Sequence, residues 1–166
     1  YLLKLLMGKL SKYLTGAQLY ICDFKNNDFK MFNKCNRHYG YKECTEGLLC
    51  YYKTFQARLD GTENTQIPQI LIFDELAAFI LSQEKKEAEE LKKKMAEILM
   101  LGRSQSCFII AGVQRAEATL FTSGSRDQFS QIIGLGNLSK EQKQMLFSND
   151  RTEMTAINGR GQGYLL

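Results

Sequence analysis

The sequence predicts an α/β domain with a mainly parallel sheet. The segments QILIFD (69–74) and SCFIIAGV (106–113) are almost wholly apolar, which is the pattern of strands buried on both faces of a parallel sheet. Strand-like segments alternate with helical ones along the chain. With 166 residues, 44% hydrophobic and 24% charged, the chain is long enough to bury a sizeable core in one domain.

Four elements are expected ahead of the first buried strand: a helix at 1–14, a strand at 18–24, irregular chain at 29–45 and a helix at 46–59. The leucines of the first segment recur at helical spacing. The strand is rich in β-prone residues and ends in a polar turn. The last helix is expected to end near Gly61, before a polar loop.

A single long helix is expected at 76–101, and the five acidic and five basic residues in its middle indicate a solvated face. A loop with a helical tail should cover 116–128. The remaining elements are expected to be a strand at 131–135, a helix at 139–147, and strands at 154–158 and 163–166. Ser139 with Gln142 three residues later has the spacing of a capping box.

The basic residues are concentrated in the N-terminal part of the chain. The whole chain has a net charge of +4, but residues 1–60 alone contain ten Lys or Arg and five Asp or Glu, which allows an anionic partner. Segment 25–55 interleaves basic and aromatic residues. Such a mixture can contact DNA, although packing of a small subdomain against a neighbouring subunit is the favoured interpretation.

The five cysteines indicate free thiols in a reducing compartment, because their number is odd and the sequence shows no signal peptide. Cys35, His38, Cys44 and Cys50 could be drawn as a zinc site, but their spacing fits no common zinc module. No apolar run approaches the roughly 20 residues that a membrane span needs.

Asp74 and Glu75 are the clearest candidate site. They directly follow four apolar residues, which places two carboxylates at the C-terminal end of a buried strand, where open α/β sheets bind ligands. One carboxylate there can hold Mg²⁺ that bridges nucleotide phosphates, and the other can orient and deprotonate a water. An acidic N-terminus for the helix that starts near Leu76 would give the same pattern, and the pattern alone leaves both interpretations open.

Gln114 follows the next buried strand. If the two strands are parallel neighbours, its amide reaches the same edge of the sheet as the acidic pair. It could sense a terminal phosphate there or hold a water. A turn residue is the alternative interpretation.

Several segments together resemble the FtsK/SpoIIIE/HerA-type family of DNA-pumping ATPases. The resemblance rests on ILIFDELAAFI, GRSQSCFIIAGVQRA, GSRDQFSQIIGLGNLS and GRGQGYLL. It is closest to the coupling ATPases of conjugative elements in Gram-positive bacteria. The segment ICDFK (21–25) matches a family strand that usually ends in Asp-Pro-Lys, with Phe24 in place of the proline.

The resemblance implies a RecA-like P-loop NTPase core that uses ATP and Mg²⁺. In it, Asp74 would be the Walker B residue that holds the metal, Glu75 the catalytic base and Gln114 the polar sensor, all three lining the nucleotide site. The family acts as a hexameric ring around duplex DNA, and a neighbour's arginine completes each site. The position of the family's arginine falls near Gln131, so Arg126 is the nearest candidate and Arg160 the second.

One family feature is absent from the sequence, which contains no phosphate loop of the form G-x-x-x-x-G-K-[ST]. YLLKLLMGKL resembles the helix that directly follows that loop. We therefore expect residues 1–166 to be a partial RecA-like motor domain that lacks the first strand and the loop and continues upstream and downstream. Such a chain should not hydrolyse ATP by itself.

The expected function is that of an ATP-dependent DNA translocase motor for conjugative transfer or for chromosome or plasmid pumping. It would act on the cytoplasmic side of the cell membrane, with conjugation or secretion machinery as its partner. A protein-secretion motor of the same superfamily would have the same catalytic residues. A catalytically silent RecA-like scaffold module is the alternative of a different class.

Overall fold

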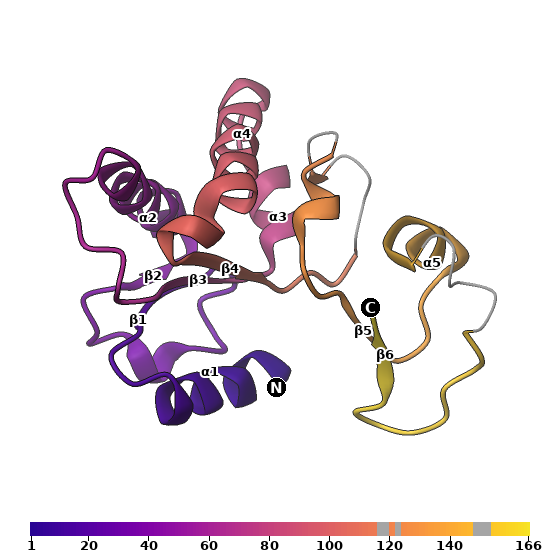
Figure 1. The fold of residues 1–166 in the computed structure, drawn as a ribbon. Helices are drawn as coiled ribbons and strands as arrows, with labels where there is room; N and C mark the ends of the chain where they lie inside the picture. Colours follow the sequence, from indigo (N-terminus) through magenta and orange to yellow (C-terminus); the bar gives the residue numbers. More distant parts are fainter. Residues whose placement is uncertain (116–119, 122–123, 148–153) are drawn as a thin grey trace. The chain divides into compact units, whose positions relative to one another are not determined.

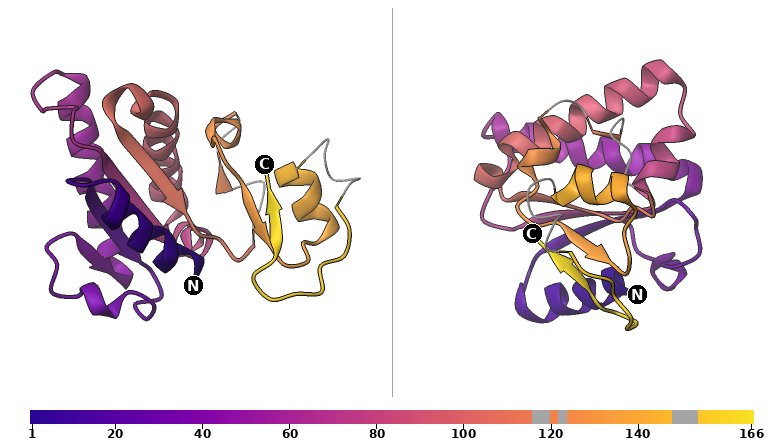
Figure 2. Two further views of the ribbon diagram at one scale, coloured as in Figure 1. Left: turned by 60° about the horizontal axis from the view of Figure 1, so that its bottom comes forward. Right: turned by 90° about the vertical axis from the view of Figure 1, so that its right-hand side faces the viewer.

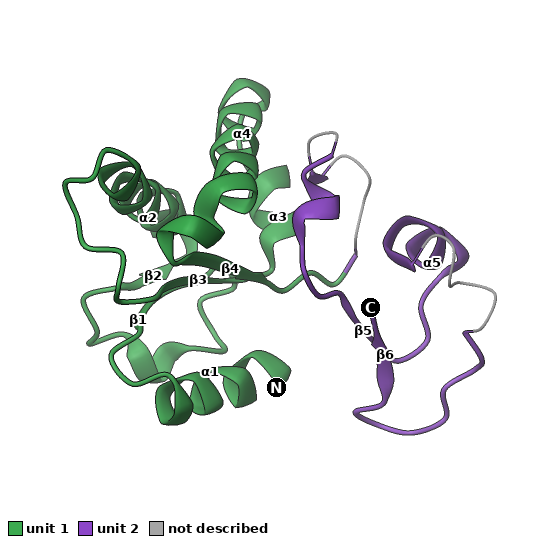
Figure 3. Ribbon diagram, viewed as in Figure 1, with its two compact units in different colours: residues 1–114 green, residues 115–166 purple. Residues whose placement is uncertain are grey.

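A computed structural model describes residues 1–115, 120–121, 124–147 and 154–166 (Figure 1). The chain divides into two compact units, residues 1–114 and residues 115–166 (Figure 3). The candidate acidic residues belong to the first unit. Each unit is described by itself.

A four-stranded parallel sheet forms the centre of the first unit. Its strands follow the order β2-β1-β3-β4. They are β1 (Gln18–Asp23), β2 (His38–Gly40), β3 (Gln69–Asp74) and β4 (Cys107–Ala111). Residues of β1 and β3 pair in register along their full length, so Asp23 lies beside Asp74 at the carboxyl end. The predicted α/β fold with a mainly parallel sheet is confirmed.

Helices cover both faces of this sheet (Figures 1 and 2). One face carries α1 (Leu2–Tyr13), and the other carries α2 (Cys44–Leu59), α3 (Leu76–Leu81) and α4 (Lys85–Leu101). Short 3-10 turns lie at Lys30–Phe32, Tyr41–Glu43 and Gly102–Gln105. None of the helices in the described ranges is both long and apolar enough to cross a membrane.

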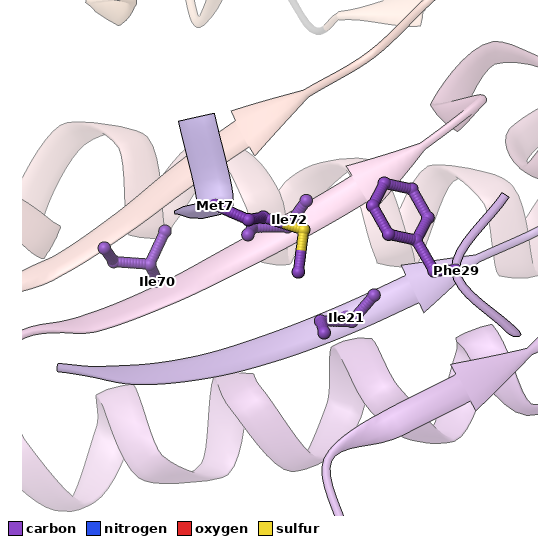
Figure 4. Close-up of a cluster of buried hydrophobic side chains, with 5 residues drawn as sticks. All are labelled: Met7, Ile21, Phe29, Ile70 and Ile72. Carbon is purple, nitrogen blue, oxygen red and sulfur yellow. The ribbon is translucent and has the colours of Figure 1, made fainter. Parts of the chain in front are cut away.

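A cluster of apolar side chains joins α1 to the sheet. Met7 of α1 packs with Ile21 of β1 and with Ile70 and Ile72 of β3, and Phe29 from the loop after β1 closes the cluster (Figure 4). All five are at most 4% exposed. Burial of each such side chain contributes about 1.5–3 kcal/mol. Because strand side chains alternate between faces, the intervening residues of β3 pack toward the other helical layer.

Arg58 ties the end of α2 to the starts of two strands. It is 3% exposed. Its Nη1 donates to the carbonyl of Gln105, just before β4, and its Nη2 donates to the carbonyl of Ile67, just before β3, both at 2.8 Å. A buried guanidinium hydrogen-bonded in this way aligns the amino ends of β3 and β4, and the carboxyl ends are thereby aligned as well.

The prediction of a single helix at 76–101 is wrong, because the chain forms two helices with a break at residues 82–84. The Ser82 hydroxyl donates to the Phe79 carbonyl at 2.7 Å, and so does the Gln83 side-chain amide at 3.2 Å. Local side-chain bonds of this kind compete with helix continuation. Glu84 then adopts an extended conformation (φ −58°, ψ 143°) and α4 begins anew.

The expectation of irregular chain throughout 29–45 is also wrong, because β2 lies inside it. The strand has only three residues and sits at the edge of the sheet, parallel to β1. A three-residue segment is too short to show an alternating pattern, so the pairing surface of β1 decides its structure. The following helix starts at Cys44, two residues ahead of the expected position.

The second unit contains an antiparallel pair of strands and one helix. The strands are β5 (Ile133–Leu135) and β6 (Gly163–Leu165), and the helix is α5 (Lys140–Phe147). The predicted capping box is confirmed, since the Ser139 N–H donates to the Gln142 side chain at 3.0 Å and the Gln142 N–H donates to the Ser139 hydroxyl at 3.2 Å. A 3-10 turn at Arg126–Gln128 lies at the end of segment 116–128, where a loop with a helical tail was expected. Residues 116–119 and 122–123 of that segment lie outside the described ranges.

The prediction of a strand at 154–158 is wrong, since these residues form no strand. The side chain of Asn137 takes the place of a strand partner. Its Oδ1 accepts from the Ile157 N–H at 2.8 Å, and its Nδ2 donates to the Ile157 carbonyl at 2.9 Å. A side-chain amide thus satisfies the backbone groups that a ladder would otherwise pair.

Gly102 should be intolerant of a side chain, since a Cβ at this position would lie 2.5 Å from the backbone oxygen of Cys107. We expect Gly102→Ala to lower the free energy of unfolding by about 1–3 kcal/mol, measured by thermal or denaturant unfolding. Gly8→Ala is the matched control, because it lies in α1 with nothing within 4 Å of the added Cβ. The control should be neutral or stabilising, since Ala favours a helix more than Gly does. Equal effects of the two substitutions would contradict the steric argument.

Candidate functional site

The acidic pair and Gln114 lie at one edge of the sheet because β3 and β4 are adjacent and parallel. Backbone bonds continue past the strand ends. The Gly112 N–H donates to the Phe73 carbonyl at 2.8 Å, and the Leu76 N–H donates to the Gly112 carbonyl at 3.0 Å. These bonds hold the two segments that follow β3 and β4 side by side as far as Glu75 and Gln114.

Asp74 is a half-buried carboxylate in an acidic environment. Burial raises the pKa of its carboxyl group above its ordinary value, and the neighbouring charges of Asp23, Asp28 and Glu75 raise it further. The positive charge of Lys25 opposes them. A carboxylate in such a place is stabilised by any cation that approaches it.

Gly112 leaves room beside Asp74. A Cβ at Gly112 would lie 3.3 Å from Asp74 Oδ1 and 3.0 Å from a methyl group of Leu3. A side chain here would therefore crowd the oxygen that faces β4. A glycine at such a point commonly marks a close approach of a ligand or of another backbone.

Asp23 is a further acid at this edge, beside the residues that the sequence pattern indicated. It is fully buried. Its Oδ2 accepts the Phe29 N–H at 2.9 Å, while its Oδ1 has no hydrogen-bond partner among the described residues. Its position as the last residue of a strand in register with β3 is the signal that could have identified it.

Glu75 has a backbone conformation that is unusual for a residue with a side chain. Its φ of 60° and ψ of 47° lie in the left-handed region, which costs free energy and is concentrated at functional sites. It occupies the N-cap position of α3, but its side chain makes no capping bond. Capping therefore does not account for this carboxylate.

The Glu75 carboxylate turns toward two other partners. Its Oε1 accepts the backbone N–H of Gln114 at 3.4 Å, and its Oε2 lies 2.9 Å from the Lys25 ammonium. The side chain is 9% exposed. Lys25 has a raised pKa, mainly because of its hydrogen bond to Glu75. The structure thus links Gln114 and Glu75, as their positions in the sequence suggested, and adds Lys25.

Arg126 and Arg160 belong to the second unit. Arg126 forms an ion pair with Asp127 at 3.2 Å, and Arg160 is exposed in a turn before β6. The positions of the two units relative to one another are not determined. The roles expected for these arginines therefore stay predictions.

The chemistry of the edge fits a hard cation such as Mg²⁺. Asp74 offers a carboxylate whose charge is disfavoured by burial and by like charges, and neighbouring Asp23 has an oxygen without a hydrogen-bond partner among the described residues. Within the described ranges, no cluster of three or more His, Cys, Asp or Glu side chains is arranged to hold a metal ion. The carboxylates of Asp74 and Asp23 are of the kind that Mg²⁺ takes in proteins, where one or two carboxylates bind it and water and phosphate oxygens complete its coordination.

The chain is related in sequence to an FtsK-type protein. No protein-family model matches it. Over 165 residues it is 27% identical to the "Ftsk domain-containing protein YdcQ" of Bacillus subtilis strain 168, an alignment that covers 90% of this chain and 34% of the relative. The chain thus spans about a third of the length of this curated relative.

Two solved structures share its fold. The pCW3 conjugation coupling protein TcpA, in its monomer form with ATPgS, matches with a TM-score of 0.70 and 18% identity over 91% of this chain and 50% of that one. The cytoplasmic domain of the type VII secretion ATPase EccC of Thermomonospora curvata matches with a TM-score of 0.63 and 16% identity over 99% of this chain and 22% of that one. The FtsK-type resemblance and the fold that it implies are confirmed.

Asp74→Asn should stabilise the protein at neutral pH. The pKa of Asp74 is higher in the folded state than in the unfolded state, so the folded protein loses this proton at a higher pH. The contribution of Asp74 to stability therefore falls as the pH rises from the unfolded pKa through the folded pKa. We expect a gain of about 2–4 °C in melting temperature at pH 7, equivalent to roughly 1 kcal/mol. The gain should fade below about pH 4, where Asp74 is protonated in both states.

The measurement is a series of thermal unfolding curves from pH 3 to pH 8 with a chelator present, so that no divalent cation compensates the charge. Glu90→Gln, at an exposed position in the middle of α4, is the control and should leave the melting temperature nearly unchanged. A gain that is the same at every pH, or no gain at pH 7, would contradict the raised pKa of Asp74.

Proposed function

We propose that this chain, which is FtsK-like in sequence and in fold, is part of the motor domain of an ATP-driven DNA translocase. One observation carries the proposal. Asp74 and Glu75 lie at the carboxyl edge of a parallel sheet, with Glu75 buried, in a left-handed conformation and bonded to the backbone of Gln114. Ligands of open α/β sheets bind at this edge.

The three residues would divide the work of phosphoryl transfer. Asp74 would hold Mg²⁺, which neutralises charge on the nucleotide phosphates when bound. Glu75 would orient the attacking water and accept its proton. Gln114 would position its amide beside the terminal phosphate. The phosphate loop expected upstream of Tyr1 would supply the remaining contacts to ATP.

The proposed cargo is DNA, most simply duplex DNA. The sequence relative is named for an FtsK domain, and one structural relative is titled a conjugation coupling protein. The excess of basic residues in 1–60 is compatible with a polyanion. The similarity to a secretion ATPase supports a second candidate, a motor that moves protein.

The proposed assembly is a hexameric ring at the cytoplasmic side of the membrane, associated with conjugation or secretion machinery. Each site would lie at a subunit boundary and take an arginine from the neighbouring subunit. Arg126 is the first candidate for that arginine and Arg160 the second. Both arginines belong to the second unit, residues 115–166.

Glu75→Gln should abolish most ATP turnover in a longer protein that includes the expected phosphate loop. Loss of a general base costs roughly 10²- to 10⁴-fold in kcat, whereas ATP binding should persist because the amide has the same shape. Steady-state hydrolysis and a nucleotide-binding titration measure the two effects. Glu87→Gln, on an exposed position of α4, is the control. Turnover equal to the parent's would remove Glu75 from this role.

Duplex DNA should accelerate the turnover that depends on Glu75. The rate is measured with and without duplex DNA at fixed salt, because such contacts weaken as salt rises. Turnover that depends on Glu75 but ignores DNA would favour the protein-secretion motor. Complete absence of turnover, even at high protein concentration, would favour a catalytically silent scaffold.

Arg126→Ala should impair turnover only through the neighbouring site. We expect a ring of Arg126→Ala subunits to lose roughly 10³-fold or more in kcat, the usual worth of such an arginine. Adding Glu75→Gln subunits should restore part of the activity, because they supply Arg126 to sites that retain Glu75. Arg160→Ala provides the matched comparison. No restoration on mixing would indicate a local structural role for Arg126.

A further inference from the structure

Lys25 balances the charge of the residue proposed as the base. Its ammonium lies 2.9 Å from Glu75 Oε2, with the lysine side chain 39% exposed and the glutamate side chain 9% exposed. A buried carboxylate without a compensating partner is strongly unfavourable. The bond from the Gln114 N–H to Oε1 is longer, at 3.4 Å, so the main support of this carboxylate comes from Lys25.

The turn after β1 places Lys25 at this position. Asp23 ends β1 in register with Asp74, so the residues that follow the two strands lie near each other. Asn26 has a φ of 50°, and its N–H donates to the Asp23 carbonyl at 2.9 Å, which closes the turn. The Phe24 ring packs edge-on against the Phe79 ring of α3, with centroids 5.7 Å apart. Phe24 therefore anchors the turn to the helix that Glu75 begins.

We infer that Lys25 is a positioning residue for Glu75, an inference that rests on the proposed function. It balances the charge of the carboxylate and holds it at the sheet edge with the rotamer that the base requires. Without the ammonium, the carboxylate lacks its cationic partner and rotates toward solvent. A displacement of about 1 Å in a reacting group is enough to cost on the order of 10²-fold in rate.

The test is ATP turnover of the longer protein with the expected phosphate loop. Lys25→Met should lower kcat roughly 10- to 100-fold with little change in the KM for ATP, because Lys25 acts through Glu75 and not on the nucleotide. Lys25→Arg should recover most of the rate, since it keeps the charge. Lys86→Met removes one positive charge from an exposed position of α4 and should leave turnover unchanged.

The decisive readout is the combination with Glu75→Gln. In that background Lys25→Met should cause no further loss of kcat, because residues that act as a unit are not additive. The same fold loss in both backgrounds would overturn the inference and assign Lys25 an independent role. Glu75-dependent turnover that Lys25→Met leaves unaltered would overturn it as well.

Thermal unfolding of the same proteins tests the pair without turnover. Lys25→Met should lower the melting temperature by about 2–4 °C when Glu75 is present and not at all in the Glu75→Gln background. Equal shifts in the two backgrounds would overturn the inference. A parent without ATP turnover would instead contradict the proposed function and leave this readout intact, so the two failures are distinguishable.

Discussion

The in-register parallel pairing of β1, β3 and β4 is the constraint on which the candidate site depends. Strands of a parallel sheet run in one direction, so their carboxyl ends must share an edge. Asp23, Asp74 and the chain leading to Gln114 meet there because the strands are level. Arg58 contributes at the opposite ends by fixing the segments that lead into β3 and β4.

The shared edge has an electrostatic consequence. Four carboxylates (Asp23, Asp28, Asp74 and Glu75) and one ammonium lie within a small region. The pKa of the Asp74 carboxyl group is raised first by its burial and then by the three neighbouring carboxylates, while the ammonium of Lys25 opposes the shift. Lys25 forms an ion pair with Glu75, which balances the charge of that carboxylate. The charge of Lys25 offsets only part of the repulsion that Asp74 experiences. Such an arrangement costs folding stability, and it provides a place where a cation and an anionic ligand bound together would be stabilised.

The fold was predictable where patterns are long and strong. The apolar run of β3 and the periodic helices of the first unit identified the α/β class, and the capping box at Ser139 located α5. The predicted elements were wrong where a few side-chain hydrogen bonds outweigh the sequence pattern, or where a strand is too short to have a pattern. The hydroxyl of Ser82 ended α3, the amide of Asn137 bonded the backbone of Ile157 where a strand was expected, and β2 was too short to show periodicity.

The sequence by itself determined that Asp74 and Glu75 lie at the carboxyl end of a buried strand, since that follows from the order of residues along one segment. The closeness of Gln114 could be inferred only by assuming that two strands are parallel neighbours. The placement of Asp23 and Lys25 beside Asp74 and Glu75 was decided by tertiary structure, because register between strands brings together residues about 50 positions apart. Local sequence alone does not decide which strands pair, since pairing also depends on the packing of the whole sheet.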